Sequence, residues 1–277
     1  MRSLLPTFAL LLAFLPVWAA PPEQACYQQC PQADGWLARR SVTLLDNEGF
    51  ALGWSSQRRA ALWVAYQLDP ADDRKVLDPR PKGFTVDTRT HPAVRSETYR
   101  NTGFDRGHLA ANSIMSRFFG PEAQRLAMHM SNIAPQTARL NRGAWQRLEM
   151  AEVDVWLADA ERVWVVTGPV WGQRPAKLGG SLPVPESFYR IWVRERAGRA
   201  PTVTGFRVPQ IVCGHEPPRY FRVPVAAIAR ATGLDFGPLA QLDEPALTDA
   251  EREAMDALPL RYARDFEKTS RPDGCTR

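Results

Sequence analysis

Residues 101–149 read NTGFDRGHLAANSIMSRFFGPEAQRLAMHMSNIAPQTARLNRGAWQRLE, and they gather most of the polar side chains that a catalytic site requires. The run 105–108, Asp-Arg-Gly-His, places a guanidinium, a flexible glycine and an imidazole in consecutive positions. Asn132 and Asn141 follow, and Glu149 closes the stretch within a pattern of helical spacing.

The chemistry of these side chains fits the hydrolysis of a phosphodiester. That reaction needs a base that activates water and positive charge that neutralises the phosphate. The imidazole of His108 has an unperturbed pKa near ~6.5 and can accept a proton at neutral pH. The amide of Asn141 and the carboxylate of Glu149 are hard oxygen ligands that suit Mg²⁺, with Mn²⁺ as the other candidate ion. Arg106 offers paired donors to a phosphate. The four residues predict a metal-dependent phosphodiesterase site.

Spacing decides how a single ion would be held. Asn141 and Glu149 are separated by about 12 Å along the axis of a helix. Both side chains could hardly reach one ion at Mg²⁺ bond lengths of about 2.1 Å. The sequence therefore predicts that Asn141 binds the ion directly and that Glu149 holds a metal-bound water.

Ordinary structural roles exist for the same residues. Asn141 could be a helix N-cap, Glu149 a solvated helix charge, and His108 a structural histidine that donates to a carbonyl. The remaining histidines are interpreted as turn or packed residues: His91, His129 and His215.

Composition indicates a globular protein with a substantial core. The 277 residues are 44% hydrophobic and 23% charged, and the net charge of +5 favours anionic partners only modestly. Repeats, heptads and a clear domain linker are lacking in the sequence. We expect one domain over residues 20–277, of the α+β class, with a sheet and flanking helices.

The N-terminus is typical of a cleavable secretory signal peptide. Arg2 precedes the apolar run LLPTFALLLAFLPVWAA, which contains two prolines and ends at small residues. We place the cut after Ala19, because a cut after Ala20 would leave Pro21 first. The mature protein is then expected to be soluble and exported to the periplasm or the medium, without a membrane partner.

Four cysteines are compatible with two disulfides in an oxidising compartment, namely Cys26, Cys30, Cys213 and Cys275. Three pairings are possible. A zinc site is the competing interpretation, but a CxxxC pair with two distant single cysteines is a poor match to finger spacing.

Hydrophobic patterns predict strands at 41–45, 61–68, 162–171, 184–195 and 202–212. They predict helices at 140–160, at 225–232 with a stop at Gly233, and at 247–266. Residues 20–35 are expected to form a loop or arm, and residues 69–100 a polar connector.

Five motifs in this order, DRGHLA, SNIAPQ, LNRGAWQRLE, VVTGP and VPESFYRI, resemble the DNA/RNA non-specific endonuclease family. The resemblance covers about residues 40–240. It implies a central, mainly antiparallel sheet flanked by helices, with a ββα-metal (His-Me finger) core. It also implies an endonuclease that cuts both DNA and RNA and leaves 5′-phosphate ends, and it favours the disulfide pairing Cys26–Cys30 and Cys213–Cys275.

The same resemblance assigns roles within the motifs. It makes His108 the general base, Asn141 the ligand of one Mg²⁺ and Glu149 the holder of metal-bound water. Arg106 and Asn132 match further catalytic positions. An upstream phosphate contact falls on Arg80 or Lys82, of which Arg80 is preferred.

One position departs from the family pattern. Many members carry an arginine four residues after the metal-associated glutamate, where this chain has Val153. The contact is either lost or supplied by a nearby residue such as Arg139, Arg142 or Arg147. The sequence leaves a homodimer and an inhibitor protein open.

Two other activities remain at this stage. A nuclease-derived module could bind nucleic acid without cutting it, and the same metal chemistry could serve a phosphatase-like enzyme or a lipid phosphodiesterase.

Overall fold

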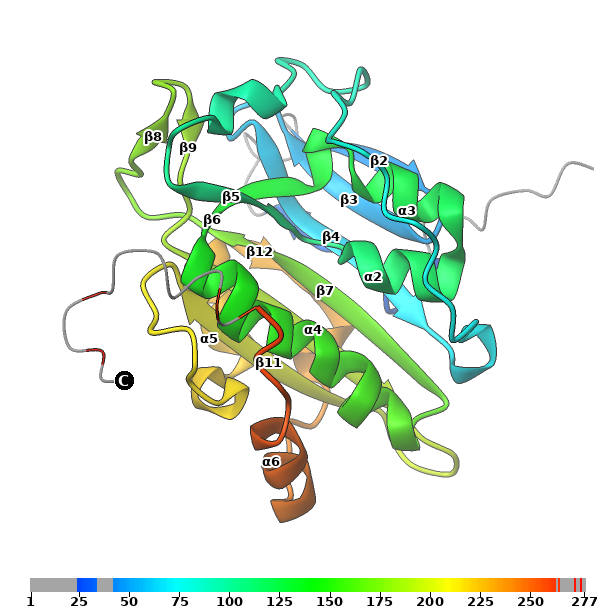
Figure 1. Ribbon diagram of the computed structural model, residues 1–277. Helices are drawn as coiled ribbons and strands as arrows, with labels where there is room; N and C mark the ends of the chain where they lie inside the picture. Colours follow the sequence, from blue (N-terminus) through cyan, green and yellow to red (C-terminus); the bar gives the residue numbers. More distant parts are fainter. Residues whose placement is uncertain (1–23, 34–41, 263, 265–271, 273–274, 276–277) are drawn as a thin grey trace, which may run out of the picture.

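A six-stranded antiparallel sheet forms the centre of the computed structural model (Figure 1), which describes residues 24–33, 42–262, 264, 272 and 275. Its strand order is β11-β10-β7-β4-β3-β2. The strands are β2 (Val42–Asn47), β3 (Phe50–Ser55), β4 (Ala60–Leu68), β7 (Arg162–Val170), β10 (Ser187–Glu195) and β11 (Thr202–Pro209). The predicted α+β class and the mainly antiparallel sheet are confirmed.

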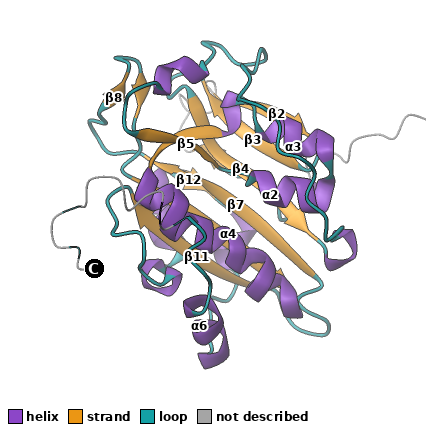
Figure 2. Cartoon of the chain, in the orientation of Figure 1, coloured by secondary structure: helices purple, strands orange, loops and turns teal. Residues whose placement is uncertain are grey.

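Both faces of this sheet are covered, which explains the almost continuous burial of β3, β4, β7 and β10. One face packs under α2 (Asn112–Ile114), α3 (Pro121–Ala127) and α4 (Gln146–Ala151), as Figure 2 shows. The other packs against α5 (Val225–Thr232) and the small pair of β1 (Gln32–Ala33) and β12 (Leu234–Asp235). Each face therefore has its own hydrophobic core.

The stretch 101–149 forms a strand-strand-helix unit. β5 (Phe104–His108) pairs antiparallel with β6 (Ile133–Thr137). The link between them carries α2, η4 (Met115–Phe119), α3 and η5 (Met130–Asn132). A helical segment then runs through η6 (Leu140–Trp145), α4, η7 (Glu152–Trp156) and η8 (Leu157–Asp159). This is the ββα arrangement that the motifs implied.

The helix over 140–160 was predicted with nearly correct ends, but its geometry is not uniform. η6 and η7 are π-helical, and only the six residues of α4 are α-helical. The residue that caps η6 is Arg139, so Asn141 is not a helix N-cap. Wider turns of this kind often occur at functional sites.

Two predictions about elements were wrong. The link between the first two predicted strands contains β3, a fully buried strand whose alternation is obscured because both faces are covered. The tail helix predicted over 247–266 is only α6 (Asp249–Asp256), with a capping box between Thr248 and Glu251. Pro259 follows it and disfavours helical conformation at the preceding residue.

The remaining short elements are η2 (Pro70–Asp72), η3 (Ser96–Tyr99), β8 (Lys177–Leu178), β9 (Leu182–Pro183), η9 (Pro218–Phe221) and η10 (Gly237–Gln241). Gly233 ends α5, as predicted, and has the left-handed conformation. The connector 69–100 is mostly irregular.

The disulfides are Cys26–Cys30 and Cys213–Cys275, the pairing that the family resemblance favoured. Within the described residues, no helix is long and apolar enough to cross a membrane. The predicted signal peptide, residues 1–19, lies outside the described residues.

Candidate active site

His108 is the last residue of β5, where it stands opposite Ile133 of β6. Gly107, the residue before it, leaves room for the side chain of Gln136 on β6. A Cβ atom at that position would lie 2.1 Å from the side-chain oxygen of Gln136, so a larger residue would force the buried Gln136 side chain to move. The glycine of the DRGH motif therefore accommodates a buried side chain of β6 next to the histidine.

Asn132 holds the chain just beyond His108. Its amide nitrogen donates to the carbonyls of Ala110 and Ala127 at 3.0 and 2.9 Å, and its amide oxygen accepts from the Ala110 N–H at 2.9 Å. The residue is fully buried and is not part of the pocket wall. Asn132 was expected among the catalytic residues; the structure places it behind the pocket wall, where its contacts hold the backbone that follows His108.

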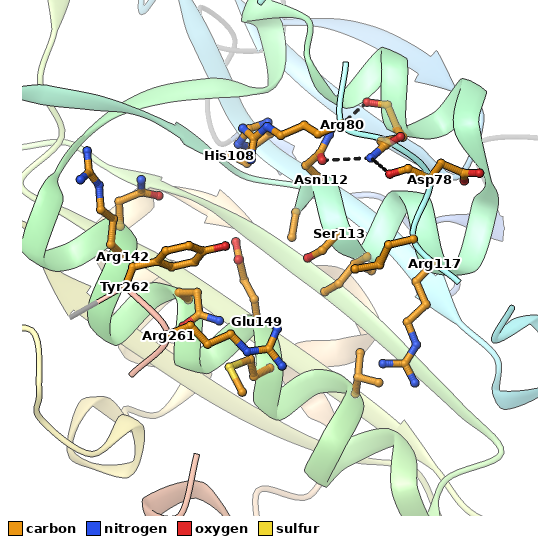
Figure 3. A pocket seen from close by; sticks show the side chains of 18 of the residues that line it. Asp78, Arg80, His108, Asn112, Ser113, Arg117, Arg142, Glu149, Arg261 and Tyr262 are labelled. Carbon is orange, nitrogen blue, oxygen red and sulfur yellow. Dashed lines mark hydrogen bonds between the residues drawn. The ribbon is translucent and has the colours of Figure 1, made fainter. Parts of the chain in front are cut away.

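A pocket of about 860 Å³ lies between the ββα unit and the connector 69–100. Five of the residues predicted from the sequence line it together: Arg80, Arg106, His108, Asn141 and Glu149. Figure 3 shows His108 and Arg80 on one side of this pocket and Glu149 and Arg142 on the other. Lys82, the alternative to Arg80, is not among the lining residues.

Asn141 is oriented by Asp105. The amide nitrogen of Asn141 donates to Oδ2 of Asp105 at 3.0 Å, and Arg142 donates to both oxygens of the same carboxylate at 2.8 and 2.7 Å. With the nitrogen committed to Asp105, the amide oxygen of Asn141 accepts no hydrogen bond from any described residue. The oxygen that a hard cation requires is therefore left available.

His108 is uncharged in this environment. Burial and, second, the positive charge of Arg80 lower the pKa of His108 to about 3. Its Nε2 atom is buried and has no hydrogen-bond partner among the described residues. The ring lies 5.5 Å from that of Phe84, centroid to centroid, and the backbone carbonyl accepts from Trp145 at 3.3 Å. Phe84 of the connector thus packs beside the imidazole, and Trp145 of the helical segment holds the backbone of the same residue.

Glu149 lies above a buried charge cluster. Burial raises the pKa of Glu149 to about 7. The positive charge of Arg190 opposes this shift, and the negative charge of Glu152 adds to it. Arg190 is 3.8 Å from Glu149 and forms a tight ion pair with Glu152. Tyr66 and Trp192 also donate to Glu152, at 2.7 and 3.1 Å. The cluster fixes the base of the pocket beneath Glu149.

Arg106 is held between aromatic rings. Its guanidinium carbon lies 5.7 Å from the ring centroid of Phe84 and 5.5 Å from that of Tyr99. Nε and Nη2 donate to the carbonyl of Ser96 at 3.2 and 2.7 Å. The positive charge therefore stays at the pocket wall in a fixed orientation.

Val153 also lines the pocket, so the cation usual at that family position is absent from the wall. Arg139 donates to the carbonyl of Cys213, and Arg147 donates to four backbone carbonyls, so neither of these two candidates lines the pocket. Arg142 does line it, with its guanidinium on Asp105.

The donor set fits a hard divalent cation with few protein ligands. The described residues contain no group of three or more His, Cys, Asp or Glu side chains that could enclose a metal. Asn141 offers a free amide oxygen, and Glu149 offers a carboxylate in the same pocket. A Mg²⁺-type ion that keeps most of its waters suits this pair.

Comparison with known proteins agrees with this geometry. Residues 33–242 match the family described as DNA/RNA non-specific endonuclease. The chain belongs to that family. It is 32% identical to human mitochondrial endonuclease G over 209 residues, which cover 70% of this chain and 69% of the relative. It is 28% identical to a nuclease of Serratia marcescens over 226 residues, covering 76% and 78%.

A solved structure supports the same assignment. The chain is similar to one in the crystal structure of an EndoG/EndoGI complex, with a TM-score of 0.63 and 26% identity over 72% of this chain and 86% of that one. The protein is accordingly a hydrolase, a non-specific DNA/RNA endonuclease of a metal-dependent family with the ββα-metal fold.

Sequence reasoning assigned no role to Asp105, Arg190, Glu152, Arg261 or Tyr262, all of which lie at or beneath the site. One signal was available. Arg190 interrupts the apolar strand SFYRIWV, and a charge in such a strand requires a buried partner. Its partner Glu152 is far away in the sequence, so the pairing itself could not be read there.

Proposed function

We propose that this protein is an exported, Mg²⁺-dependent endonuclease that hydrolyses phosphodiester bonds of DNA and RNA and leaves 5′-phosphate ends. His108 acts as the general base, and Arg80 and Arg106 bind the phosphate. Asn141 holds the ion directly and Glu149 through a water. The main support is the meeting of these five side chains in one pocket of a fold that belongs to this nuclease family.

The base function of His108 follows from its neutral state. A neutral imidazole can remove a proton from water, and Arg80 is the charge that lowers its pKa after burial. A phosphate bound at Arg80 would offset that charge, so the imidazole would become a stronger base when substrate is in place. Substrate binding and activation of the base are thereby coupled.

Stabilisation of the reacting phosphate would come from fixed positive groups. Arg106 is held by two rings and a carbonyl, so it needs little reorganisation when charge develops on the phosphate. When bound, Mg²⁺ supplies Lewis-acid stabilisation of the phosphate and the leaving oxygen; Mn²⁺ prefers similar ligands. By accepting from the amide nitrogen, Asp105 would leave the amide oxygen of Asn141 available to hold the ion.

Little sequence preference is expected, because the pocket offers guanidinium groups for phosphates, and such contacts carry no base information. Nucleic acids are also favoured over small phosphodiesters as substrates, since several separate cations suit a polyanion.

Export is supported by the two disulfides, which persist in oxidising compartments. We propose that residues 1–19 are a leader cut after Ala19 and that residues 20–277 form a single nuclease domain.

The decisive experiment incubates purified mature protein with supercoiled plasmid and with RNA, with Mg²⁺ and with chelator. The parent should cut both substrates only with Mg²⁺, and His108→Ala should be at least about 10²-fold slower. His215→Ala changes an exposed histidine away from the pocket and should cut like the parent. Products should accept a 5′ label from a kinase only after phosphatase treatment. An intact plasmid with the parent protein, or full activity in His108→Ala, would refute the proposal.

A further inference from the structure

Two residues that follow the family match in the sequence lie at the pocket. The match ends at residue 242, yet Arg261 and Tyr262 line the pocket together with Glu149. Figure 3 shows both side chains on the Glu149 side, opposite His108. Both are exposed, and half of the Tyr262 surface is accessible. A segment outside the shared domain thus supplies two side chains to its active site.

This segment is anchored to the catalytic helix. Arg147 of α4 donates to the carbonyls of Met255 and Asp256 at 3.3 and 3.2 Å, which are the last residues of α6. Met255 is fully buried, and Asp256 pairs with Arg219 at 2.8 Å. Because α4 also carries Glu149, the residues that leave α6 emerge beside the metal-associated end of the pocket.

The charge of Arg261 is available to a ligand. Two other guanidinium groups of the pocket are engaged, Arg117 with Asp73 at 2.6 Å and Arg142 with Asp105 at 2.7 Å. Arg261 forms no ion pair or hydrogen bond with any described residue, and it faces a pocket that already presents Arg80. An exposed guanidinium beside an exposed aromatic ring is the combination with which proteins hold the phosphate and the base of a nucleotide.

We propose that Arg261 and Tyr262 form the outer wall of the nucleic-acid site. Arg261 binds a backbone phosphate next to the one that is cut, and Tyr262 stacks on a neighbouring base. This inference rests on the proposed function, since it names two further substrate-binding residues of the same site. It makes the segment after α6 part of the substrate-binding surface.

The test separates binding from chemistry. Binding of a fluorescent single-stranded oligonucleotide is measured in chelator, where no cleavage occurs, for the parent, Arg261→Gln, Tyr262→Ala and Tyr262→Phe. Arg261→Gln should weaken binding about fivefold and reduce the slope of log affinity against log salt by about 0.7. Tyr262→Ala should weaken binding at least about fivefold, whereas Tyr262→Phe keeps the ring and should bind like the parent.

Matched controls exist in the same chain. Arg264→Gln removes an exposed arginine three positions from Arg261, and Arg230→Gln removes one on α5; neither residue lines the pocket. Both controls should keep parental affinity and salt slope. In Mg²⁺, Arg261→Gln and Tyr262→Ala should raise KM with kcat nearly unchanged.

Two results would overturn the inference. If Arg261→Gln and Tyr262→Ala both keep the affinity, the salt dependence and the KM of the parent, the segment after α6 does not touch the substrate. If these variants cleave faster or bind more tightly than the parent, the segment after α6 obstructs the pocket instead. Failure of the parent to cut any substrate would count against the proposed function, whereas the binding comparison in chelator would still decide the role of Arg261 and Tyr262.

Discussion

The carboxylate of Asp105 accepts a hydrogen bond from the amide nitrogen of Asn141 at 3.0 Å, and this contact determines which way the amide faces. Asp105 is three residues before His108 on β5, whereas Asn141 lies on the helix that follows β6. One contact thus joins the strand of the proposed base to the helix of the proposed metal ligand. Asp105 does not line the pocket, so its effect is indirect.

Replacing Asp105 by alanine should weaken metal binding, because Asn141 loses the partner that orients its amide oxygen. The Mg²⁺ concentration for half-maximal cleavage should rise about 10- to 100-fold, as is common for residues that orient metal ligands. Much of the lost rate should return at saturating Mg²⁺. Asp72→Ala, at an exposed carboxylate of η2, is the control. An unchanged metal requirement in Asp105→Ala would contradict the prediction.

Replacing Glu152 by glutamine should strongly destabilise the fold. The Glu152–Arg190 pair is fully buried, and its loss leaves the Arg190 guanidinium in the core with only the longer contact to Glu149 at 3.8 Å. The expected fall in the free energy of unfolding is about 3–5 kcal/mol, measured by urea denaturation. Glu122→Gln breaks the exposed pair with Arg125 and should cost about 1 kcal/mol or less. Equal effects of the two changes would be inconsistent with a special role for the buried pair.

Asn132→Ala should destabilise the chain around His108 rather than remove a substrate contact. Three hydrogen bonds to buried backbone groups are lost, at about 1–3 kcal/mol for each group left unpaired. We expect a lower urea midpoint and a lower kcat, with an unchanged pH profile and KM. Gln57→Ala removes an exposed amide and serves as the control. A raised KM with parental stability would instead place Asn132 in contact with substrate.

Asp87 should make stability depend on pH in the acid range. Burial raises the pKa of Asp87, but contacts with His129, Arg89 and Ser131 outweigh it and hold the pKa well below its ordinary value. Because the folded-state pKa is depressed, the carboxylate stabilises the fold above the unfolded pKa of about 3.9, and this contribution is lost as pH falls further.

Asp87→Asn should therefore lower the free energy of unfolding by about 2 kcal/mol at pH 7, and the difference from the parent should shrink below about pH 4. Urea midpoints at pH 7 and pH 3 measure this directly. A difference that stays constant, or grows toward low pH, would show that the ion pairs of Asp87 do not contribute as described.

Several features could be predicted from local patterns. The β4, β7, β10 and β11 strands are long apolar runs, and α5 has a glycine stop, so their spacing alone identifies them. β3 was missed because burial on both faces removes the alternation that marks a strand. The tail helix was predicted too long, since helical spacing continues past the position where Pro259 disfavours helix.

The residue types of the site were determined by the sequence itself: a base, hard oxygen donors and guanidinium groups are properties of single side chains at recognisable spacings. Only the tertiary structure decided how they act. It placed Asn132 behind the pocket, joined Asn141 to Asp105, set Glu149 above the Arg190–Glu152 pair and brought Arg261 in from beyond the family domain. The physical reason is that burial, charge pairing and orientation depend on contacts between residues far apart in the chain.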